Sequence, residues 1–235
     1  MLSDDAALKN WMLSVTYYDD RYRVIQTIAG NPCAGGYDTL TTGYSFAGRI
    51  ESQKTKHTAF AKTIEYTEHF VYDQRGRILE HTLEGLPGQP KVMMASLHYD
   101  QVGELNEKQI HAVANGESYQ PFVQKTDYFY NIRGWLTAIN DPENIASEND
   151  IFAMKLHYND EGTGTCSKQY NGNIAWVNWA TNRDQVKSIY NYSYDDLNRL
   201  TSGMYYQGNG GGYSHDGSFD EKDITYDANG NILTL

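Results

Sequence analysis

The sequence predicts an all-β fold, a curved open antiparallel sheet of tandem β-hairpins. Three observations support this prediction: a turn motif recurs along the chain, the intervening segments alternate in polarity with a period of two, and no stretch carries a sustained helical period. The 235 residues include 20 tyrosines and 21 glycines, which fits a protein of strands and turns. Self-similarity at a near-constant spacing indicates a repeat architecture.

The recurring motif is Tyr, then Asp or Asn, two free positions, Gly or Asn, a polar residue and an aliphatic residue. Clear copies are YDQRGRI, YDQVGEL, YNIRGWL, YDDLNRL and YDANGNI. Looser copies begin at Tyr18, Tyr44 and Tyr158, and successive starts lie 26 to 36 residues apart. The turn residues of the clear copies are Tyr72, Asp73, Gly76, Tyr99, Asp100, Gly103, Tyr130, Asn131, Gly134, Tyr194, Asp195, Asn198, Tyr226, Asp227 and Gly230.

Each residue of the motif has a physical role in a hairpin turn. The Asp accepts hydrogen bonds from backbone N–H groups further along the turn. The Gly supplies the positive φ that a type I turn followed by a bulge requires, and Asn198 is the next-best residue there. The motif therefore predicts hairpin corners whose register is fixed by a bulge. Tyr22 occupies the Gly position of the first copy, so we expect that copy to be distorted.

The segments between the turns read as strands. Lys62–Asp73 places Ile64 and Phe70 on one parity and threonine, glutamate and histidine on the other, which predicts one buried face. Val186–Tyr194 alternates in the same way, with aromatic residues on one side. Arg49–His57 is polar at nearly every position, so it is expected to be solvated on both faces or to lie at a rim.

The repeats favour a single array that spans residues 1–235. Residues 1–14 are expected to form a poorly ordered or short helical segment, with one or two helical turns over Asp5–Trp11. The last motif ends near Leu235, so we expect the chain to be a fragment cut from something longer. A four-stranded-blade propeller is the alternative fold, but its blades need about 40–45 residues each.

Composition excludes several classes of function. A formal charge of −11 argues against a nucleic-acid partner, because a phosphate backbone attracts basic proteins. No apolar run is long enough to span a membrane, and the N-terminus lacks the pattern of a secretory signal. The two cysteines, Cys33 and Cys166, are too few for a disulfide framework and are expected to be buried or idle thiols.

The repeated Tyr-Asp motif, together with the string QYNGNIA that runs from Gln169 to Ala175 before Trp176, resembles the bacterial RHS/YD-repeat proteins. The resemblance covers about residues 15–235. It implies hairpins aligned in a spiralling sheet, a shell that encloses an attached toxin or effector, and a secreted or cell-surface location. It implies as partners further repeats of the same parent chain and the enclosed effector. The family's self-cleavage segment and variable toxin tail have no counterpart in this sequence.

Catalytic and metal sites find little support in the sequence. Asp19/Asp20 and Asp195/Asp196 are adjacent acids, but neighbouring strand residues point to opposite faces, and Asp19 and Asp195 are turn residues. His69 and His81 lie at comparable distances from the turn at Gly76 and could face each other as a cross-strand metal pair. The favoured interpretation is two polar strand residues on a solvent-exposed face. The acids of 216–223 are interpreted as a solvated loop. We expect no enzyme activity, no catalytic residue, no metal and no cofactor.

Aromatic residues supply the one binding feature of note. Flat rings suit sugars or apolar peptides, and the candidate ligand-binding residues are Trp135, Trp176, Trp179 and Tyr170. Packing of the sheet is the favoured interpretation of these rings. The leading function is therefore a wall segment of a shell, and the alternative is a cell-surface carbohydrate-binding module with a glycan as partner. Raw sheet edges also predict edge-to-edge self-association.

Overall fold

The computed structural model describes residues 12–33, 36–162, 166–183, 186–209 and 212–234. Within these residues the chain is all β and without a helix, so the predicted fold class is confirmed. One antiparallel sheet contains sixteen of the described strands, and strands β1 to β8 and β10 to β16 are hydrogen-bonded neighbours in chain order. Strand β9 pairs with β8 off this path, and β17 and β18 form a separate two-stranded sheet. The proposed helix over Asp5–Trp11 lies outside the described residues.

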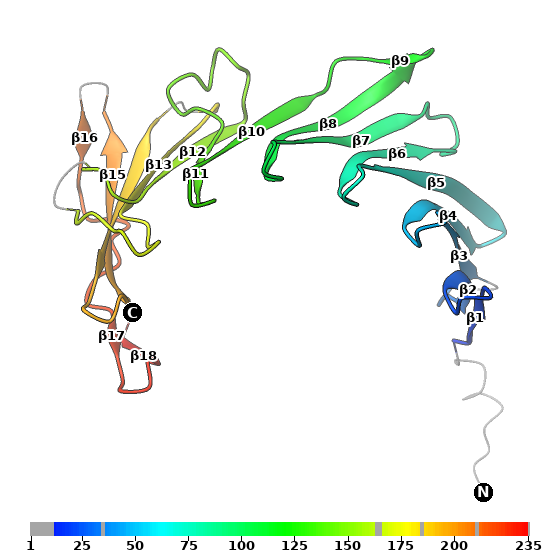
Figure 1. Cartoon of the computed structure of the whole chain (residues 1–235), viewed down its shortest axis with the longest axis horizontal. Helices are drawn as coiled ribbons and strands as arrows, with labels where there is room; N and C mark the ends of the chain where they lie inside the picture. Colours follow the sequence, from blue (N-terminus) through cyan, green and yellow to red (C-terminus); the bar gives the residue numbers. More distant parts are fainter. Residues whose placement is uncertain (1–11, 34–35, 163–165, 184–185, 210–211, 235) are drawn as a thin grey trace, which may run out of the picture. The chain divides into compact units, whose positions relative to one another are not determined.

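The chain divides into two compact units, which we call the first and second units. The first comprises residues 1–98 and 108–123, and the second comprises residues 99–107 and 124–235. The strands of the first unit follow one another from blue to green in Figure 1. They are β1 (Ser14–Tyr18), β2 (Val24–Gly30), β3 (Tyr37–Tyr44), β4 (Ile50–Ala59), β5 (Lys62–Tyr72), β6 (Ile78–Glu84), β7 (Val92–Tyr99), β8 (Leu105–Asn115) and β9 (Ser118–Tyr119), with the end of β7 and the start of β8 belonging to the second unit.

The first unit is a thin sheet with little buried apolar side chain. Its buried hydrophobic residues, among those described, are Met93 and Ala112. No residue of β5 is fully buried and Ile64 is 45% exposed, so the prediction of one buried face there is wrong. Nothing in the described part of this unit covers β5 deeply enough to bury that face. The polar strand β4 pairs with β3 on one side and β5 on the other, so it does not lie at a rim.

Polar cross-strand pairs link the strands of the first unit. Lys54 on β4 lies 2.7 Å from Glu65 on β5, and this contact lowers the pKa of the Glu65 carboxyl. His69 on β5 contacts Glu84 on β6 at 3.1 Å, and His81 on β6 contacts Glu68 on β5 at 2.9 Å. Cross-strand polar pairs of this kind each contribute at most about 1 kcal/mol, so they fix register more than they add stability.

The second unit continues the hairpin pattern from green to red (Figure 1). Its strands are β10 (Gln124–Tyr130), β11 (Leu136–Ile139), β12 (Phe152–His157), β13 (Trp176–Thr181), β14 (Ser188–Tyr194), β15 (Leu200–Gly208), β16 (Tyr213–Ser214), β17 (Thr225–Tyr226) and β18 (Ile232–Thr234).

The second unit holds most of the buried side chains, because its loops fold back over its strands. The loop 140–151 buries Ile145, which forms a cluster with Ala153 of β12 and Ala180 of β13. Pro142 in the same loop is fully buried. The side chain of Asn140 fixes the start of this loop, because it accepts from the Asp127 N–H and donates to the Phe152 carbonyl. Other buried apolar residues of this unit are Ala138, Tyr158, Ala175, Val177, Ile189 and Ile224.

Candidate functional site

The seven-residue turn from the motif's tyrosine to its aliphatic residue, which we call a corner, has one backbone conformation in seven copies. The N–H of the second residue donates to the carbonyl of the sixth at 2.8–2.9 Å, and the N–H of the fifth donates to the carbonyl of the second at 2.9–3.2 Å. The fifth residue always has positive φ. In six of these hairpins the register shifts immediately before the tyrosine, which is the mark of a bulge. The seven corners begin at Tyr18, Tyr44, Tyr72, Tyr99, Tyr130, Tyr194 and Tyr226.

The side chain at the second position caps each corner. Oδ1 of Asp195 accepts from the N–H groups of Leu197 and Arg199, each at 2.9 Å. These N–H donors, the one from Arg199 foremost, hold the pKa of the Asp195 carboxyl below its ordinary value. Backbone donors act in the same direction on Asp19 and Asp73, and at Asp227 the Asn231 side chain has the largest effect. In the looser second copy, Ser45 Oγ performs the capping role by accepting from the Arg49 N–H at 3.0 Å.

The first corner corrects a prediction. Tyr22 adopts φ of 60° and makes the same backbone hydrogen bond to Asp19 as glycine makes elsewhere, so the expectation of a distorted copy is wrong. The side chain of Tyr22 is 89% exposed, so it meets no steric obstacle beyond its own backbone. Asp19 accepts from the N–H groups of Arg21 and Arg23, and these bonds hold the turn in place despite the cost of a left-handed tyrosine.

A ladder of six tyrosine hydroxyls joins corners to the ones before them. The motif tyrosine donates through its hydroxyl to the carbonyl of an aliphatic residue at the end of the preceding corner, at 2.7–3.0 Å. The donor and acceptor pairs are Tyr44 to Val24, Tyr72 to Ile50, Tyr130 to Leu105, Tyr158 to Leu136, Tyr194 to Ile174 and Tyr226 to Leu200. Sequence reasoning gave these tyrosines only the role of ending a strand, because the partner carbonyl is more than 19 residues away.

Arginine at the sixth position adds a second link between corners. Arg199 donates to Asp195 of its own corner at 2.7 Å and lies over the Tyr226 ring of the next corner, 4.6 Å from its centroid. Arg23 repeats both contacts, with Asp19 at 2.7 Å and the Tyr44 ring at 4.6 Å. We call the hydroxyl bond and the arginine contact together the inter-repeat clamp. Where both parts are present, as at Arg23 with Tyr44 and Arg199 with Tyr226, the clamp links neighbouring hairpins without a shared apolar core.

The copy at Tyr158 departs from the tight corner, and we call it the split corner. Tyr158 begins it, but the left-handed glycine, Gly172 at φ of 102°, comes fourteen residues later. The base of the loop is closed because the Gln169 N–H donates to the Tyr158 carbonyl and the Ala175 N–H donates to the His157 carbonyl. Ile174 then offers its carbonyl to Tyr194, as the final aliphatic residue of a corner does. The segment QYNGNIA is therefore the closing half of a corner that contains an insertion.

The four candidate ligand-binding aromatics fall into two groups. Trp176 stacks on His157, with centroids 3.4 Å apart, and Trp179 stacks on Tyr190 at 5.6 Å, so both rings pack along the sheet. Trp135 and Tyr170 instead line one groove of about 230 Å³ in the second unit. This is the Trp135 groove, and the residues that form it are Asn131, Ile132, Arg133, Trp135, Tyr158, Asn159, Gln169 and Tyr170.

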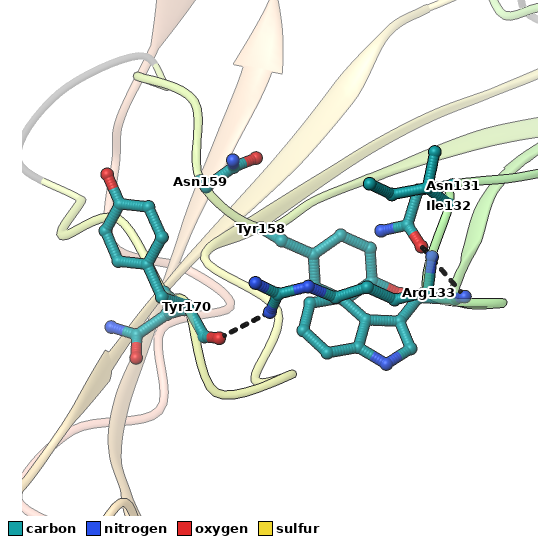
Figure 2. A pocket seen from close by; sticks show the side chains of 8 residues that line it. Asn131, Ile132, Arg133, Tyr158, Asn159 and Tyr170 are labelled. Carbon is teal, nitrogen blue, oxygen red and sulfur yellow. Dashed lines mark hydrogen bonds between the residues drawn. The ribbon is translucent and has the colours of Figure 1, made fainter.

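The Trp135 groove lies where a corner meets the split corner, and Figure 2 shows its side chains. Trp135 stands at the sixth position, where four other corners carry arginine. Its ring contacts the next motif tyrosine, Tyr158, with 5.0 Å between the ring centroids. The Arg133 guanidinium lies over the Trp135 ring, 5.0 Å from its centroid, and donates from Nη1 to the Tyr170 carbonyl at 2.9 Å. Tyr170 is 64% exposed, so its ring is open to a ligand at the rim.

The histidines pair with carboxylates rather than with one another. His69 is opposite Thr82 and His81 is opposite Phe70, so the two histidines occupy adjacent ladder positions whose side chains project to opposite faces. The suggestion that they face each other is therefore wrong. Across the described part of the chain, no cluster of three or more histidine, cysteine or acidic side chains could hold a metal ion. Cys33 and Cys166 are free thiols.

The acidic loop after β16 is exposed at Asp216, Glu221 and Asp223, in agreement with a solvated loop, and Asp220 is the exception. The Asp220 side chain is 2% exposed and lies 2.7 Å from both His215 and Lys222. It also accepts from the Tyr205 N–H at 2.8 Å. Burial alone would raise the pKa of Asp220, but these donors outweigh it and lower the pKa to about 2. Asp220 therefore anchors the loop to β15.

The chain is similar to several solved structures. No family model matches it, and no curated protein does. Among solved structures, it is similar to "Crystal Structure of TcdB2-TccC3-Cdc42", with 12% identity, TM-score 0.30 and coverage of 92% of this chain and 15% of that one. The same complex without its hypervariable C-terminal region gives 10% identity, TM-score 0.31 and coverage of 95% and 15%. A porin-like protein from Bacteroides uniformis gives 12% identity, TM-score 0.20 and coverage of 89% and 91%.

These likenesses are too weak to support an argument about function. The chain spans about 15% of the length of the toxin-complex chains that it resembles. In the described residues, no helix is both long and apolar enough to cross a membrane.

Proposed function

We propose that this chain is a wall segment of an RHS-type shell, which encloses or shields an attached toxin or effector polypeptide. The observation that carries the proposal is the inter-repeat clamp. The corners at Tyr44, Tyr130 and Tyr194 supply both a hydroxyl donor for the preceding repeat and a carbonyl acceptor for the next, and the other corners supply at least one of the two. Hairpins can therefore add one after another without a limit set by core size. A sheet built in this way suits enclosure better than it suits an isolated compact domain. From the resemblance of the motif to RHS/YD-repeat proteins, we also propose a secreted or cell-surface location.

Catalysis is not part of this proposal. The carboxylates of Asp19 and Asp195, the acids that form adjacent pairs with Asp20 and Asp196, are occupied by corner N–H groups and by arginine. An acid that caps a turn in this way is held as a hydrogen-bond acceptor.

Limited proteolysis of the parent chain tests the wall proposal. The full reading frame that contains this sequence is expressed, and cleavage of any polypeptide attached to the repeats is compared with cleavage of that polypeptide alone. We expect protection in the intact chain and loss of protection when Tyr194→Phe and Tyr226→Phe break two rungs of the tyrosine ladder. Equal cleavage of the attached and the isolated polypeptide would contradict the proposal.

Self-association through sheet edges belongs to the same proposal. Strand β1 has all five residues exposed, and among the described strands it pairs on one side alone, with β2. An edge of this kind offers unpaired backbone groups to a second copy. Size-exclusion chromatography with light scattering is expected to show species larger than a monomer. A strict monomer at high concentration would count against edge pairing.

A second candidate function, carbohydrate binding, is favoured by the Trp135 groove. Here an exposed tyrosine ring lies beside amide side chains from Asn159 and Gln169, which are suited to sugar hydroxyls. Tryptophan fluorescence titration with a panel of glycans tests it. Saturable quenching that disappears in Tyr170→Ala is the expected result, and a flat response to every glycan would leave the wall proposal alone.

A further inference from the structure

The Trp135 groove differs from the other corners in its charge. Arg133 is the one charged residue among the eight that line the groove. In the corners at Tyr18, Tyr72 and Tyr194, an arginine forms an ion pair with the aspartate at the second position. The corner at Tyr130 has Asn131 in place of that aspartate, and Asn131 Oδ1 is occupied by the N–H groups of Arg133 and Trp135. A cation therefore stands in this groove without a carboxylate from its own corner.

The position of Arg133 is set by neutral groups. Nη1 donates to the Tyr170 carbonyl, and the guanidinium lies over the Trp135 ring. A guanidinium has five N–H donors in a planar fork. Among the described residues, Arg133 uses one of them, in its hydrogen bond to the Tyr170 carbonyl. Among the nearby acids, Asp160 contacts His157 and Glu161 pairs with Lys168, while the Glu104 carboxylate of the preceding corner lies beside Gly134. Arg133 therefore lines the groove with donors that have no hydrogen-bond partner among the described residues, in a protein whose net charge is −11.

We propose that the Trp135 groove binds a saccharide that carries a carboxylate, with Arg133 holding the carboxylate and Tyr170 stacking against the ring. The inference rests on the second candidate function and names its ligand class. Arginine pairs with a carboxylate through two parallel N–H donors, which gives orientation as well as affinity. The negative face of the Tyr170 ring suits the polarised C–H bonds on one face of a sugar. Asn159 and Gln169 present donors and acceptors for hydroxyl groups.

The size of the groove limits the ligand. Pockets for drug-sized molecules occupy about 300–1,000 Å³. The Trp135 groove, at about 230 Å³, holds one ring. We therefore assign it to a single acidic residue, terminal or protruding, rather than to a stretch of several sugars. An acidic peptide is the competing class, but it does not need the exposed ring of Tyr170 and the amide pair together.

A matched pair of sugars tests the proposal. Methyl β-D-glucuronide and methyl β-D-glucoside share one ring and differ at C6, where the first carries a carboxylate and the second a hydroxymethyl group. Binding to the whole chain is measured by saturation-transfer NMR and by the fluorescence of Trp135, at about 150 mM salt to screen long-range attraction. We expect the glucuronide to bind about tenfold more tightly than the glucoside, a preference of the size that one charge-assisted pair provides.

Two variants and one control assign that preference to Arg133. Arg133→Gln is expected to bring the two sugars to equal affinity, and Tyr170→Ala is expected to weaken both. The control is Arg21→Gln, because Arg21 occupies the same fourth position of another corner, donates to the Phe46 carbonyl at 3.0 Å and lies over the Phe46 ring. It is expected to leave both affinities unchanged. Arg133→Lys keeps the charge without the fork and is expected to retain part of the preference, which separates loss of charge from loss of fold.

The outcomes distinguish the role of Arg133 from carbohydrate binding as such. Equal or glucoside-favoured binding would overturn the role of Arg133 and leave carbohydrate binding intact. Absence of binding by both sugars would overturn the inference and the second candidate function together. Acetate binding as tightly as the glucuronide, with no effect of Tyr170→Ala, would reduce the groove to a simple anion site and overturn the saccharide assignment. Each of these outcomes leaves the wall proposal to its own test.

Discussion

The first and second units contain the same corner but differ in what surrounds it. In the first unit the described buried hydrophobic residues are Met93 and Ala112, and polar pairs such as Lys54 with Glu65 occupy the strands. In the second unit, the loop 140–151 returns to the sheet and a cluster with Ile145 forms, while residues 169 and 175 hydrogen-bond to the carbonyls of Tyr158 and His157. The difference teaches that the corner and its clamp specify the hairpins by themselves, whereas burial and the groove come from insertions between corners.

Two isoleucines give the largest expected contrast between the units. Ile189 on β14 is 1% exposed, whereas Ile64 on β5 is 45% exposed. Ile189→Ala is expected to lower the free energy of unfolding by about 2–5 kcal/mol, since it removes buried methyl groups and leaves a cavity. Ile64→Ala is expected to cost less than about 1 kcal/mol. Urea denaturation followed by far-ultraviolet circular dichroism measures both, and equal costs would remove the distinction between the units.

The tyrosine ladder gives the next largest effect. Tyr194 donates through its hydroxyl to the Ile174 carbonyl at 2.8 Å, and Tyr194→Phe is expected to cost about 1–2 kcal/mol because a partly buried carbonyl loses its donor. Tyr18 is 57% exposed, and its hydroxyl has no partner among the described residues, so Tyr18→Phe is expected to be neutral within about 0.5 kcal/mol. Denaturation midpoints of the two variants provide the comparison. A neutral Tyr194→Phe would mean that the ladder does not stabilise the array.

Replacing a left-handed residue is expected to change the free energy of unfolding by a smaller amount and, at Tyr22, to raise it. Tyr22→Gly is expected to raise the free energy of unfolding by about 0.5–1 kcal/mol, because relief of a left-handed tyrosine exceeds the entropy that glycine adds to the unfolded chain. The reverse change at an equivalent position, Gly76→Tyr, is expected to destabilise, since a Cβ there would come within 3.0 Å of the Arg49 guanidinium. Thermal unfolding measures both. A stabilising Gly76→Tyr would contradict the shared corner geometry.

The response to pH is expected to separate the two units. Corner aspartates in both units have lowered pKa values, so the stability that they contribute is present above pH 4 and is lost as pH falls through their folded pKa. The described tyrosines with raised pKa values lie in the second unit, and burial raises the pKa of Tyr194 to about 12. Their contribution is complete below pH 10 and is lost as pH rises toward 12.

Acid should therefore weaken both units, whereas alkali should weaken the second unit first. Amide exchange or residue-resolved NMR across pH 3 to 12 would follow each unit separately. Earlier loss of the first unit in alkali would contradict the assignment of the raised pKa values to buried tyrosines.

The corner could be predicted from the sequence because all of its information is local. Asp73 and Gly76 lie within four residues of each other, and their chemistry fixes the turn. The Trp135 groove could not be predicted, because the insertion separates Tyr158 from Gly172 and hides the corner that they share. Sequence reasoning selected Trp135 and Tyr170 as aromatics but grouped them with Trp176 and Trp179, since the partners His157 and Tyr190 become visible only from strand register. Tyr22 was misjudged because the caps from Asp19 were not weighed against its φ.

Native-state hydrogen exchange at the corner amides tests the central claim most directly. The claim is that seven corners share one backbone, so the N–H groups at the second and fifth positions, such as those of Asp73 and Gly76, are hydrogen-bonded in every copy. We expect these amides to be protected in all seven corners, with the amide of the third position exchanging rapidly beside them as an internal reference. Exchange at unstructured-chain rates at the second and fifth positions of most corners would contradict the account.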